Sequence, residues 1–365
     1  MKILIVGDWV FDIYEKAIYD AFNSLGVDVH KFKVASYFKY YQYPLLNKNK
    51  NKNKNKNKIA SFWYKAQNKF SIGPAINKLN RDLIDNTTCN KYDVVFIYRG
   101  VHIHPSTINK LKSTGALIFA YNNDDPFSGF YPNYYWRHFI KGIKYYNHIF
   151  SYRIKNISEY SNLGANSISL LRSYYIKENN YFIDNIKYNE MVKVVFIGHY
   201  ENDGRDEIIL ELFKNNFNVE IHGTGWEKSE IYSELLSFNG TIKPIYNKDY
   251  NLALNEADIS LVFFSKINND TYTRRVFEIP ITKTVMVCEY NSDIETLFKN
   301  EQEIILFKSK DDCIQKIKLL IENRTIIDNI KENAYRRLIT DGHEVTDRVK
   351  EVISIYDKIK NGVLR

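Results

Sequence analysis

Short apolar runs that end at glycine or polar residues recur along the chain, and helical patterns separate them. Residues 3–6 form a β-branched run that ends at Gly7-Asp8, residues 12–25 have helical periodicity, and residues 27–32 form a second apolar run. A strand, a helix and a strand in this order predict parallel pairing, because the helix carries the chain back to the starting edge. The sequence therefore predicts an α/β fold with a parallel sheet.

The same pattern occurs in both halves of the chain. The predicted strands of the first half continue at 93–98, 116–121 and 148–153, and those of the second half lie at 192–197, 219–222, 259–264, 284–288 and 303–307. Residues 178–190 are polar and Asn-rich, which is typical of an interdomain linker. We therefore expect an N-terminal domain at 1–183, a C-terminal domain at 191–343 and a helical tail at 344–365.

Residues 47–58 alternate Asn and Lys and contain six lysines. Such a tract cannot pack a core, so it predicts a disordered surface loop. The alternative is a basic flap held near anionic lipid. The aromatic segment 59–64 follows, and it either enters an interface or resumes the fold.

Composition places the chain among soluble globular proteins, with 44% hydrophobic and 26% charged residues. The net charge of +8 fits an anionic partner, namely a nucleotide, a nucleic acid or an acidic membrane surface. The lysines concentrate in one low-complexity tract and not on a patterned face, which argues against nucleic acid. Three widely spaced cysteines give no disulfide or metal framework, and no run approaches the ~18 apolar residues of a membrane helix. We expect a cytoplasmic protein, with any membrane contact peripheral.

A polar stretch at 268–280 runs into a predicted short helix that begins with Arg274 and Arg275. Helix starts attract anions because their first N–H groups lack partners. Glu278, expected two turns in, follows an apolar pair. A phosphate at the helix start and a carboxylate further along suit a nucleoside diphosphate and its ribose. The alternative is an ordinary amphipathic helix with solvated arginines.

Two other predicted strand ends in the second half carry glycines. Gly198, His199 and Arg205 follow one strand, and Gly223 and Gly225 follow the next. Glycines let backbone N–H groups approach a phosphate. His199 is either a ligand or a rim histidine.

In the first half, Asp124 and Asp125 follow the strand at 116–121. A carboxylate at a strand end can act as a general base or bind a sugar hydroxyl. An Asx turn before Pro126 is the alternative, and we favour it for Asp125.

Through the order and spacing of its motifs, the segment 192–355 resembles GT-B glycosyltransferases, specifically the group-1-type enzymes and their CgeB-like branch. The matching residues are Gly198 with Arg205, Gly223-x-Gly225-Trp226, Ala257-Asp258-Ile259-Ser260-Leu261, Arg275-Val276-Phe277-Glu278, and His343-Glu344 with Arg348. The resemblance implies two Rossmann-like domains facing a cleft, with the C-terminal helix returning to the N-terminal domain.

The resemblance also implies roles for particular residues. Glu278 matches the glutamate that binds the donor ribose, Asp270 stands where group-1 enzymes carry a glutamate near the sugar, and Arg205 and Arg274 can neutralise the diphosphate. The family often has a glycine-ended turn after the glutamate helix, where this chain has Pro280 and Lys283. We therefore expect a different turn, since left-handed geometry is costly for lysine.

These inferences predict a glycosyltransferase that uses a nucleotide-sugar donor and a glycan or lipid-linked glycan acceptor in bacterial surface-glycan synthesis, without a metal or other cofactor. The alternatives are a nucleotide-sugar epimerase and a non-catalytic glycan-binding or coat protein. The predicted donor-binding residues are Gly198, His199, Arg205, Gly223, Gly225, Thr273, Arg274 and Glu278, and the predicted catalytic residues are Asp270 and Asp124.

Overall fold

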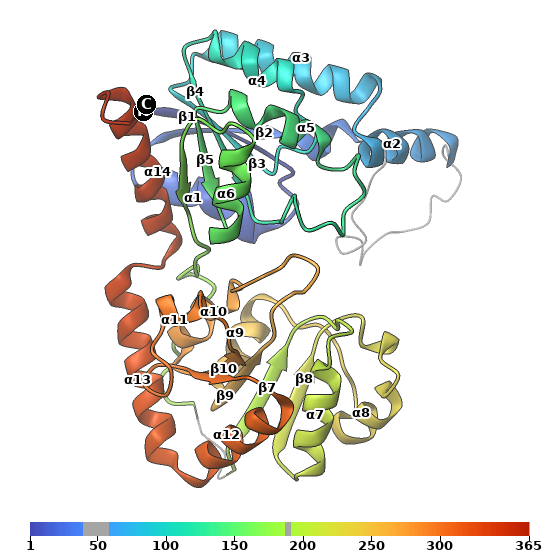
Figure 1. Ribbon diagram of the computed structural model, residues 1–365, viewed down its shortest axis with the longest axis vertical. Helices are drawn as coiled ribbons and strands as arrows, with labels where there is room; N and C mark the ends of the chain where they lie inside the picture. Colours follow the sequence, from blue (N-terminus) through green and yellow to red (C-terminus); the bar gives the residue numbers. More distant parts are fainter. Residues whose placement is uncertain (39–57, 187–190, 365) are drawn as a thin grey trace. The chain divides into compact units, whose positions relative to one another are not determined.

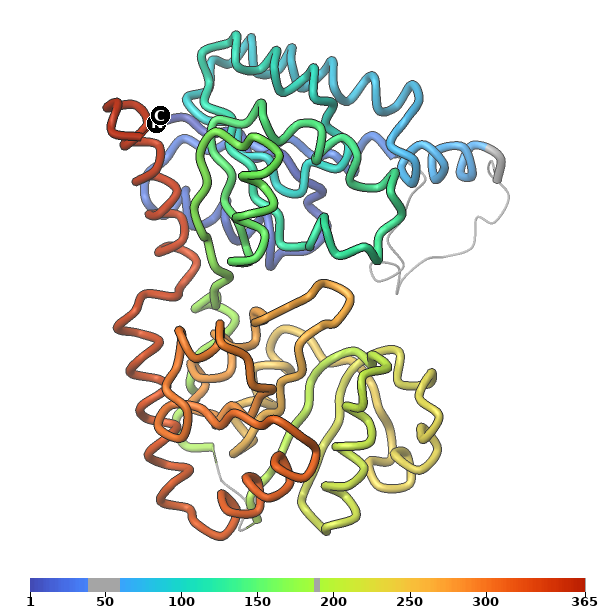
Figure 2. Tube along the Cα trace, viewed as in Figure 1, coloured from blue at the N-terminus to red at the C-terminus, as the bar shows by residue number. Residues whose placement is uncertain are grey.

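The computed structural model describes residues 1–38, 58–186 and 191–364. They form two compact units: unit 1 is Met1–Arg172 with Val345–Arg365, and unit 2 is Ser173–Glu344. Figure 1 shows a sheet flanked by helices in each unit, and Figure 2 shows the chain leaving unit 1 in green and returning to it in red. The predicted α/β fold with two Rossmann-like domains is confirmed.

Unit 1 contains a six-stranded parallel sheet in the order β2-β1-β3-β4-β5-β6. The strands are β1 (Lys2–Gly7), β2 (Asp28–Lys33), β3 (Val94–Tyr98), β4 (Leu117–Asn122), β5 (His148–Ser151) and β6 (Ile168–Leu170). In the interior strand β1, Ile3 pairs with Val29 on one side and with Val94 on the other. Ile3, Leu4 and Ile5 are fully buried, as expected for a parallel strand that is covered on both faces.

Helices cover the unit 1 sheet and complete its core. They are α1 (Ala17–Ser24), α2 (Lys58–Phe70), α3 (Pro74–Asn90), α4 (Pro105–Lys112), α5 (Arg137–Gly142), α6 (Ile154–Asn162) and α14 (Val345–Lys360), with a π-helix η1 (Asp12–Lys16) and 3-10 turns η2 (Val34–Tyr37) and η4 (Ile143–Tyr145). Leu4 and Val6 of β1 pack in one cluster with Leu79 of α3 and Leu111 of α4. The C-terminal helix α14 packs on α1, so it returns to the N-terminal domain as predicted.

Several unit 1 elements differ from the sequence prediction. The helix predicted at 12–25 is broken, because Tyr14 has non-helical φ/ψ (−111°, −105°) and a π-helix precedes α1. Helices α2 and α3 were not predicted, and neither was the three-residue strand β6. The Asn-Lys tract lies outside the described residues, except for Lys58, which begins α2.

Unit 2 contains a five-stranded parallel sheet in the order β11-β10-β9-β7-β8. The strands are β7 (Lys193–Ile197), β8 (Asn218–His222), β9 (Ile259–Val262), β10 (Val285–Glu289) and β11 (Ile305–Phe307). Val194 of β7 pairs with Val219 of β8 and with Ile259 of β9, so β7 is an interior strand with the edge strand β8 on one side. All five strands fall within residues that the sequence predicted as strands, apart from one-residue differences at their ends.

The unit 2 helices are α7 (Arg205–Lys214), α8 (Tyr232–Asn239), α9 (Asn247–Asn255), α10 (Arg275–Glu278), α11 (Ile294–Leu297), α12 (Lys310–Glu322) and α13 (Arg324–Asp341), with 3-10 turns η5 (Trp226–Lys228) and η6 (Pro280–Thr282). Buried Asp258, just before β9, binds Lys331 and Arg324 of α13, each at 2.8 Å. These two ion pairs anchor the sheet to α13. The aspartate of the Ala257–Leu261 motif therefore has a structural role.

The boundary between the units lies at residues 172 and 173, ahead of the linker expected at 178–190. Asn251 and Asn255 of α9 accept hydrogen bonds from the backbone N–H groups of Tyr181 and Ile183, at 3.1 and 2.8 Å. These bonds hold the segment around Tyr181 and Ile183 against α9 of unit 2. The low apolar content of this segment did not predict such an attachment. Among the helices of the described ranges, none combines the length and apolar character needed to cross a membrane.

Candidate functional site

The carboxyl ends of β7 and β9 form the topological switch point of the unit 2 sheet. From β7 the chain moves to β8 on one side and later returns to β9 on the other. In open parallel sheets, the connections diverge at such a point and leave a place for a ligand. The predicted donor-binding residues at 198–205, 223–225 and 273–278 all follow the carboxyl ends of these three strands, so they gather at one edge of unit 2.

Two glycines join the loops that follow β7 and β8. The N–H of Gly198 donates to the His222 carbonyl at 2.9 Å, and the indole N–H of Trp226 donates to the Gly198 carbonyl at 3.1 Å. A Cβ on Gly223 would lie 1.7 Å from the Gly198 carbonyl oxygen, so no side chain fits there. Gly225 has a left-handed φ of 79°. The glycines predicted to approach a phosphate therefore also bring two backbones into contact.

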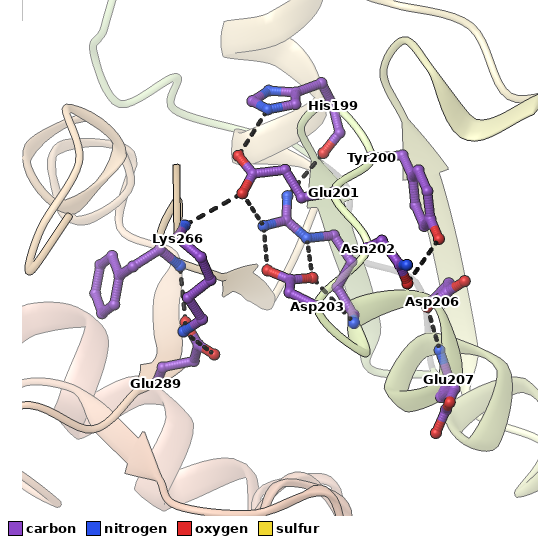
Figure 3. A network of polar contacts seen from close by, with 11 residues as sticks. His199, Tyr200, Glu201, Asn202, Asp203, Asp206, Glu207, Lys266 and Glu289 are labelled. Atoms are coloured by element: carbon purple, nitrogen blue, oxygen red, sulfur yellow. Dashed lines mark hydrogen bonds and ion pairs between the residues drawn. The ribbon is translucent and has the colours of Figure 1, made fainter. Parts of the chain in front are cut away.

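Arg205 begins α7, and its side chain is only 3% exposed. Its Nε and Nη2 donate to the two carboxylate oxygens of Asp203 at 2.7 and 2.6 Å, and its Nη1 donates to the His199 carbonyl at 2.7 Å. Figure 3 shows the surrounding network, with His199, Glu201 and Asp203 labelled. The enclosed guanidinium holds the loop in shape, which differs from the phosphate-binding role that the sequence led us to expect.

Glu201 ties the loop after β7 to the loop after β9, and the sequence analysis did not select it. Its Oε1 lies 2.9 Å from His199 Nε2, and its Oε2 accepts the backbone N–H of Lys266 at 3.2 Å (Figure 3). Burial raises the pKa of Glu201, but hydrogen bonds from His199 and Ser265 and the charge of Arg205 outweigh burial and lower this pKa to about 2. His199, with a side chain 56% exposed, lies at the rim of this network.

The lowered pKa of Glu201 predicts acid sensitivity. Since the pKa falls from 4.5 to about 2 on folding, the stabilisation is fully present above pH 4.5 and is lost as the pH falls toward 2. We expect Glu201→Gln to lower the free energy of unfolding at pH 7 by about 3 kcal/mol and to flatten its pH dependence in that window. Urea unfolding across the window measures this effect. Glu207→Gln, at an exposed position of α7, is the control, and identical pH profiles for the wild type and Glu201→Gln would contradict the prediction.

The loop after β9 is anchored by Glu289 at the end of β10. The Glu289 carboxylate accepts the backbone N–H of Phe264 at 2.8 Å and pairs with Lys266 Nζ at 3.0 Å. Asp270 lies on this loop, where its backbone N–H donates to the Ser265 carbonyl at 2.9 Å. The predicted catalytic Asp270 is therefore part of an anchored turn on the switch-point side of the sheet.

Glu278 ends α10, which contains only four residues, so this carboxylate stands one turn from the helix start and not two. Its Oε1 pairs with Arg274 Nη2 at 2.5 Å, and its Oε2 accepts the hydroxyl of Tyr250 at 2.8 Å. Burial and the Glu278 charge raise the pKa of Tyr250 well above its ordinary value. Because so short a helix contributes little dipole, an anion here must be held by side chains and individual N–H groups.

Arg275 was not among the predicted donor-binding residues, although it belongs to the motif that carries the resemblance. Its Nη2 lies 3.1 Å from the position that a Cβ on Gly198 would take. Within the described ranges, no hydrogen bond or ion pair engages its guanidinium. The sequence did not distinguish the two arginines, since Arg274 and Arg275 stand four and three residues before Glu278 and both spacings allow a helical ion pair.

Thr273 adds a second group without a partner at the same edge. Its hydroxyl is buried and has no hydrogen-bond partner among the residues that the structure describes. A buried polar atom without a partner is costly, and a bound ligand is one explanation for it. The Thr273 hydroxyl and the Arg275 guanidinium can therefore bind a ligand at this edge without giving up a contact within the described residues.

The turn after α10 corrects one expectation. Lys283 adopts the left-handed conformation, with φ 53° and ψ 48°, that we expected a lysine to avoid. Its Nζ pairs with Glu332 of α13 at 2.8 Å and lies 4.9 Å from the ring centres of Phe182 and Tyr335. These contacts offset the backbone cost of about 1 kcal/mol, so the turn is kept with a lysine in place of glycine.

In unit 1, the switch point lies between β1 and β3, where Arg99 bridges two carboxylates. Arg99 Nη2 pairs with Asp124 at 2.9 Å and donates to the Tyr135 hydroxyl at 2.9 Å, and its Nη1 lies 3.5 Å from Asp8. Burial raises the pKa of the Asp8 carboxyl. The positive charge of Arg99 lowers this pKa in part, and the negative charge of Asp124 raises it further. The predicted catalytic Asp124 therefore shares its cation with Asp8, a residue that the sequence analysis did not select.

A pocket opens beside the Arg99 ion pairs with Asp8 and Asp124, and it is lined by residues that include Gly7, Asp8, Arg99 and His102.

Asp125 is fully buried and its Oδ1 accepts the N–H of Phe127 at 2.9 Å, so the Asx-turn interpretation of this residue is confirmed. In residues 1–38, 58–186 and 191–364, there is no group of three or more His, Cys, Asp or Glu side chains arranged to hold a metal ion.

Comparison with known protein families matches residues 205–354 to a family described as Glycosyl transferase-like. Comparison with curated proteins finds no significant match. The matched segment begins at α7 and extends into α14, so it includes the loop after β9 and α10.

Solved structures match the whole chain at low sequence identity. Sucrose-phosphate synthase from Thermosynechococcus elongatus superposes with a TM-score of 0.70 at 8% identity, covering 99% of this chain and 100% of that one. HepE from Anabaena, in complex with UDP, gives 0.66 at 9% identity over 98% and 100%. A glycosyltransferase from Rickettsia africae gives 0.64 at 12% identity over 98% of both chains. The chain therefore has the GT-B fold of glycosyltransferases and carries a glycosyltransferase-like domain.

Proposed function

We propose that the protein is a glycosyltransferase that takes a sugar from a nucleotide-sugar donor, which unit 2 binds at the carboxyl ends of β7 and β9. The observation that carries this proposal is Arg275, whose guanidinium lies beside the Gly198 backbone without an ion-pair partner in the described ranges. The Glycosyl transferase-like match includes Arg275, and HepE, a protein of the same fold, binds UDP.

The residues at this edge divide into two groups. Arg275, the Thr273 hydroxyl and the backbone around Gly198 bind the diphosphate, and Glu278 binds the ribose hydroxyls by exchanging one of its present contacts. Arg205 positions the loop after β7 and does not touch the donor. The proposed diphosphate ligand is therefore Arg275 and not the buried Arg205.

The proposed transfer needs positive charge where negative charge develops. The bond between the anomeric carbon and the donor phosphate oxygen breaks, a bond to the acceptor oxygen forms, and the acceptor hydroxyl gives up its proton. Charge accumulates on the departing diphosphate, where a fixed guanidinium stabilises it without a metal. Asp270 is the carboxylate candidate of unit 2, and Asp124 and Asp8 are the unit 1 candidates for binding an acceptor hydroxyl.

The acceptor and the setting rest on the resemblance to group-1-type and CgeB-like proteins. We propose a glycan or lipid-linked glycan acceptor in bacterial surface-glycan synthesis on the cytoplasmic side of the membrane. Nucleoside diphosphate released from a nucleotide sugar in the presence of such an acceptor supports transfer. An altered sugar still attached to its nucleotide indicates an epimerase, and glycan binding without turnover indicates a non-catalytic protein.

The donor site is tested by nucleotide titration. With UDP, GDP, CDP and TDP as ligands in calorimetry or thermal shift, we expect one nucleotide to bind, and Arg275→Ala to weaken its affinity tenfold to a hundredfold, since a charge-assisted hydrogen bond contributes about 1.5–3 kcal/mol. The unfolding midpoint without ligand should stay near that of the wild type, because Arg275 has no hydrogen bond or ion pair to lose among the residues that the structure describes.

Arg336→Ala removes an exposed arginine of α13 and is the matched control. No binding of any nucleotide by the wild type, or unchanged affinity in Arg275→Ala, would overturn the donor site as assigned.

A further inference from the structure

Helix α2 exposes large apolar side chains on unit 1. The exposed side chains of α2 and of the turn after it are Phe62 (73%), Trp63 (54%), Phe70 (39%) and Ile72 (55%). The opposite side of the helix faces the protein, since Gln67 is 4% exposed and Tyr64 packs against the unit 1 core. Exposed aromatic side chains that lie this close together mark an interaction surface.

Positive charge accompanies these apolar side chains. Lys65 and Lys69 are exposed on the same helix. The sequence from 29 to 81 contains 13 lysines and arginines and no aspartate or glutamate, whereas the whole chain has a net charge of only +8. The rest of the chain is therefore net negative, and the positive excess is concentrated in the segment that includes α2. We call Phe62, Trp63, Lys65, Lys69, Phe70 and Ile72 the α2 surface.

The composition of the α2 surface favours a lipid bilayer over other partners. Helices that lie in a membrane interface combine Trp, Phe and aliphatic side chains with lysines, and they bind anionic lipid through both. A nucleic-acid surface would present more cations than apolar groups, because phosphate contacts dominate its affinity. The α2 surface has four apolar side chains and two lysines.

We propose that the α2 surface docks the protein on anionic lipid bilayers. Phe62 and Trp63 enter the boundary between headgroups and acyl chains, and Lys65 and Lys69 contact lipid phosphates. The lack of acidic residues from 29 to 81 removes the repulsion that anionic headgroups would otherwise meet. This inference does not depend on the proposed sugar transfer.

Trp63 provides a direct signal for the test. Of the four tryptophans, Trp136 and Trp226 are 2% and 1% exposed, Trp9 is partly exposed, and Trp63 is 54% exposed. We expect vesicles of phosphatidylcholine with phosphatidylglycerol to shift the emission of the full-length protein to shorter wavelength, and vesicles of phosphatidylcholine alone to give a smaller shift. Trp63→Phe should still sediment with the anionic vesicles but lose most of the shift.

The double variant Phe62→Ser/Trp63→Ser decides the role of the apolar side chains. We expect its partition onto anionic vesicles to fall about tenfold or more, because two large apolar side chains no longer leave water. Its unfolding midpoint should match that of the wild type, since both positions are exposed. Phe238→Ser, at a 47% exposed position of α8, is the matched control and should bind like the wild type.

Three outcomes would overturn the proposal. Wild-type partition of the double variant would show that lysines alone attach the protein. A concentration-dependent dimer that the double variant loses, without vesicle binding, would make the α2 surface a contact between copies. Loss of single-stranded nucleic-acid binding in that variant, again without vesicle binding, would assign the surface to nucleic acid.

Discussion

Replacing Gly223 with alanine should lower the free energy of unfolding by about 4 kcal/mol or more, an unusually large effect for one methyl group. The new Cβ would lie 1.7 Å from the backbone oxygen of Gly198, and backbone cannot move aside as a flexible side chain can. The loops after β7 and β8 would have to separate, which breaks the hydrogen bond from Trp226 to Gly198. Chemical denaturation monitored by tryptophan fluorescence, to which the buried Trp226 contributes, measures this loss.

Gly240→Ala separates this clash from ordinary backbone strain. Gly240 ends α8 with a positive φ of 72°, but a Cβ there would meet nothing within 4 Å. Only the strained backbone conformation, with φ 72° and ψ −73°, penalises alanine at this position, by about 1–3 kcal/mol. Equal losses in the two variants would show that the contact between Gly198 and Gly223 is not the cause.

Arg205→Met should lower the free energy of unfolding by about 3–5 kcal/mol, because it leaves two buried carboxylates without their cation. Asp203 and Glu201 have side chains 6% and 7% exposed, and Arg205 forms a two-bonded pair with Asp203 and lies 3.8 Å from Glu201. Methionine keeps much of the buried volume, so the loss reports on charge and hydrogen bonding. Urea denaturation at neutral pH gives the value.

The double variant Arg205→Met/Asp203→Asn tests the pairing, because removing both charges should recover part of the stability. Nucleotide titration of the same proteins then separates positioning from direct contact. A stable Arg205→Met protein that has lost nucleotide affinity would restore Arg205 as a diphosphate ligand and would contradict the enclosed network seen around it.

The strands could be predicted from sequence because parallel strands that are buried on both faces read as continuous apolar runs. Residues 192–197, with Val194, Val195 and Phe196 fully buried, are an example. Helix α2 was missed because its aromatic run was interpreted only as an interface segment or a continuation of the fold, and α3 was missed because its polar residues, four of them Asn, outnumber its apolar ones. In α3, Leu79 and Leu83 form a narrow buried stripe within a polar helix, and tertiary packing decides the outcome.

The gathering of the candidate residues at one sheet edge could be predicted from the sequence, but the contacts of each arginine could not. Strand ends gather at one sheet edge whatever their side chains, so glycines and charged residues after β7, β8 and β9 were expected there. Whether an arginine faces a ligand depends on which carboxylates lie near it in space. Asp203 encloses Arg205, Glu278 takes Arg274, and Arg275 is left beside Gly198.

The return of α14 to unit 1 has a consequence for the order in which the domains mature on the ribosome. Unit 2 is one continuous stretch, so it can close its core as soon as residue 344 has emerged. Unit 1 must wait longer, because Val349, Val352 and Tyr356 of α14 follow unit 2 in the chain, and their helix packs on α1. Until then, the face of α1 that α14 will cover stays open to water. Unit 1 is thus begun before unit 2 and completed after it, and its nascent form carries an apolar surface that a chaperone can recognise.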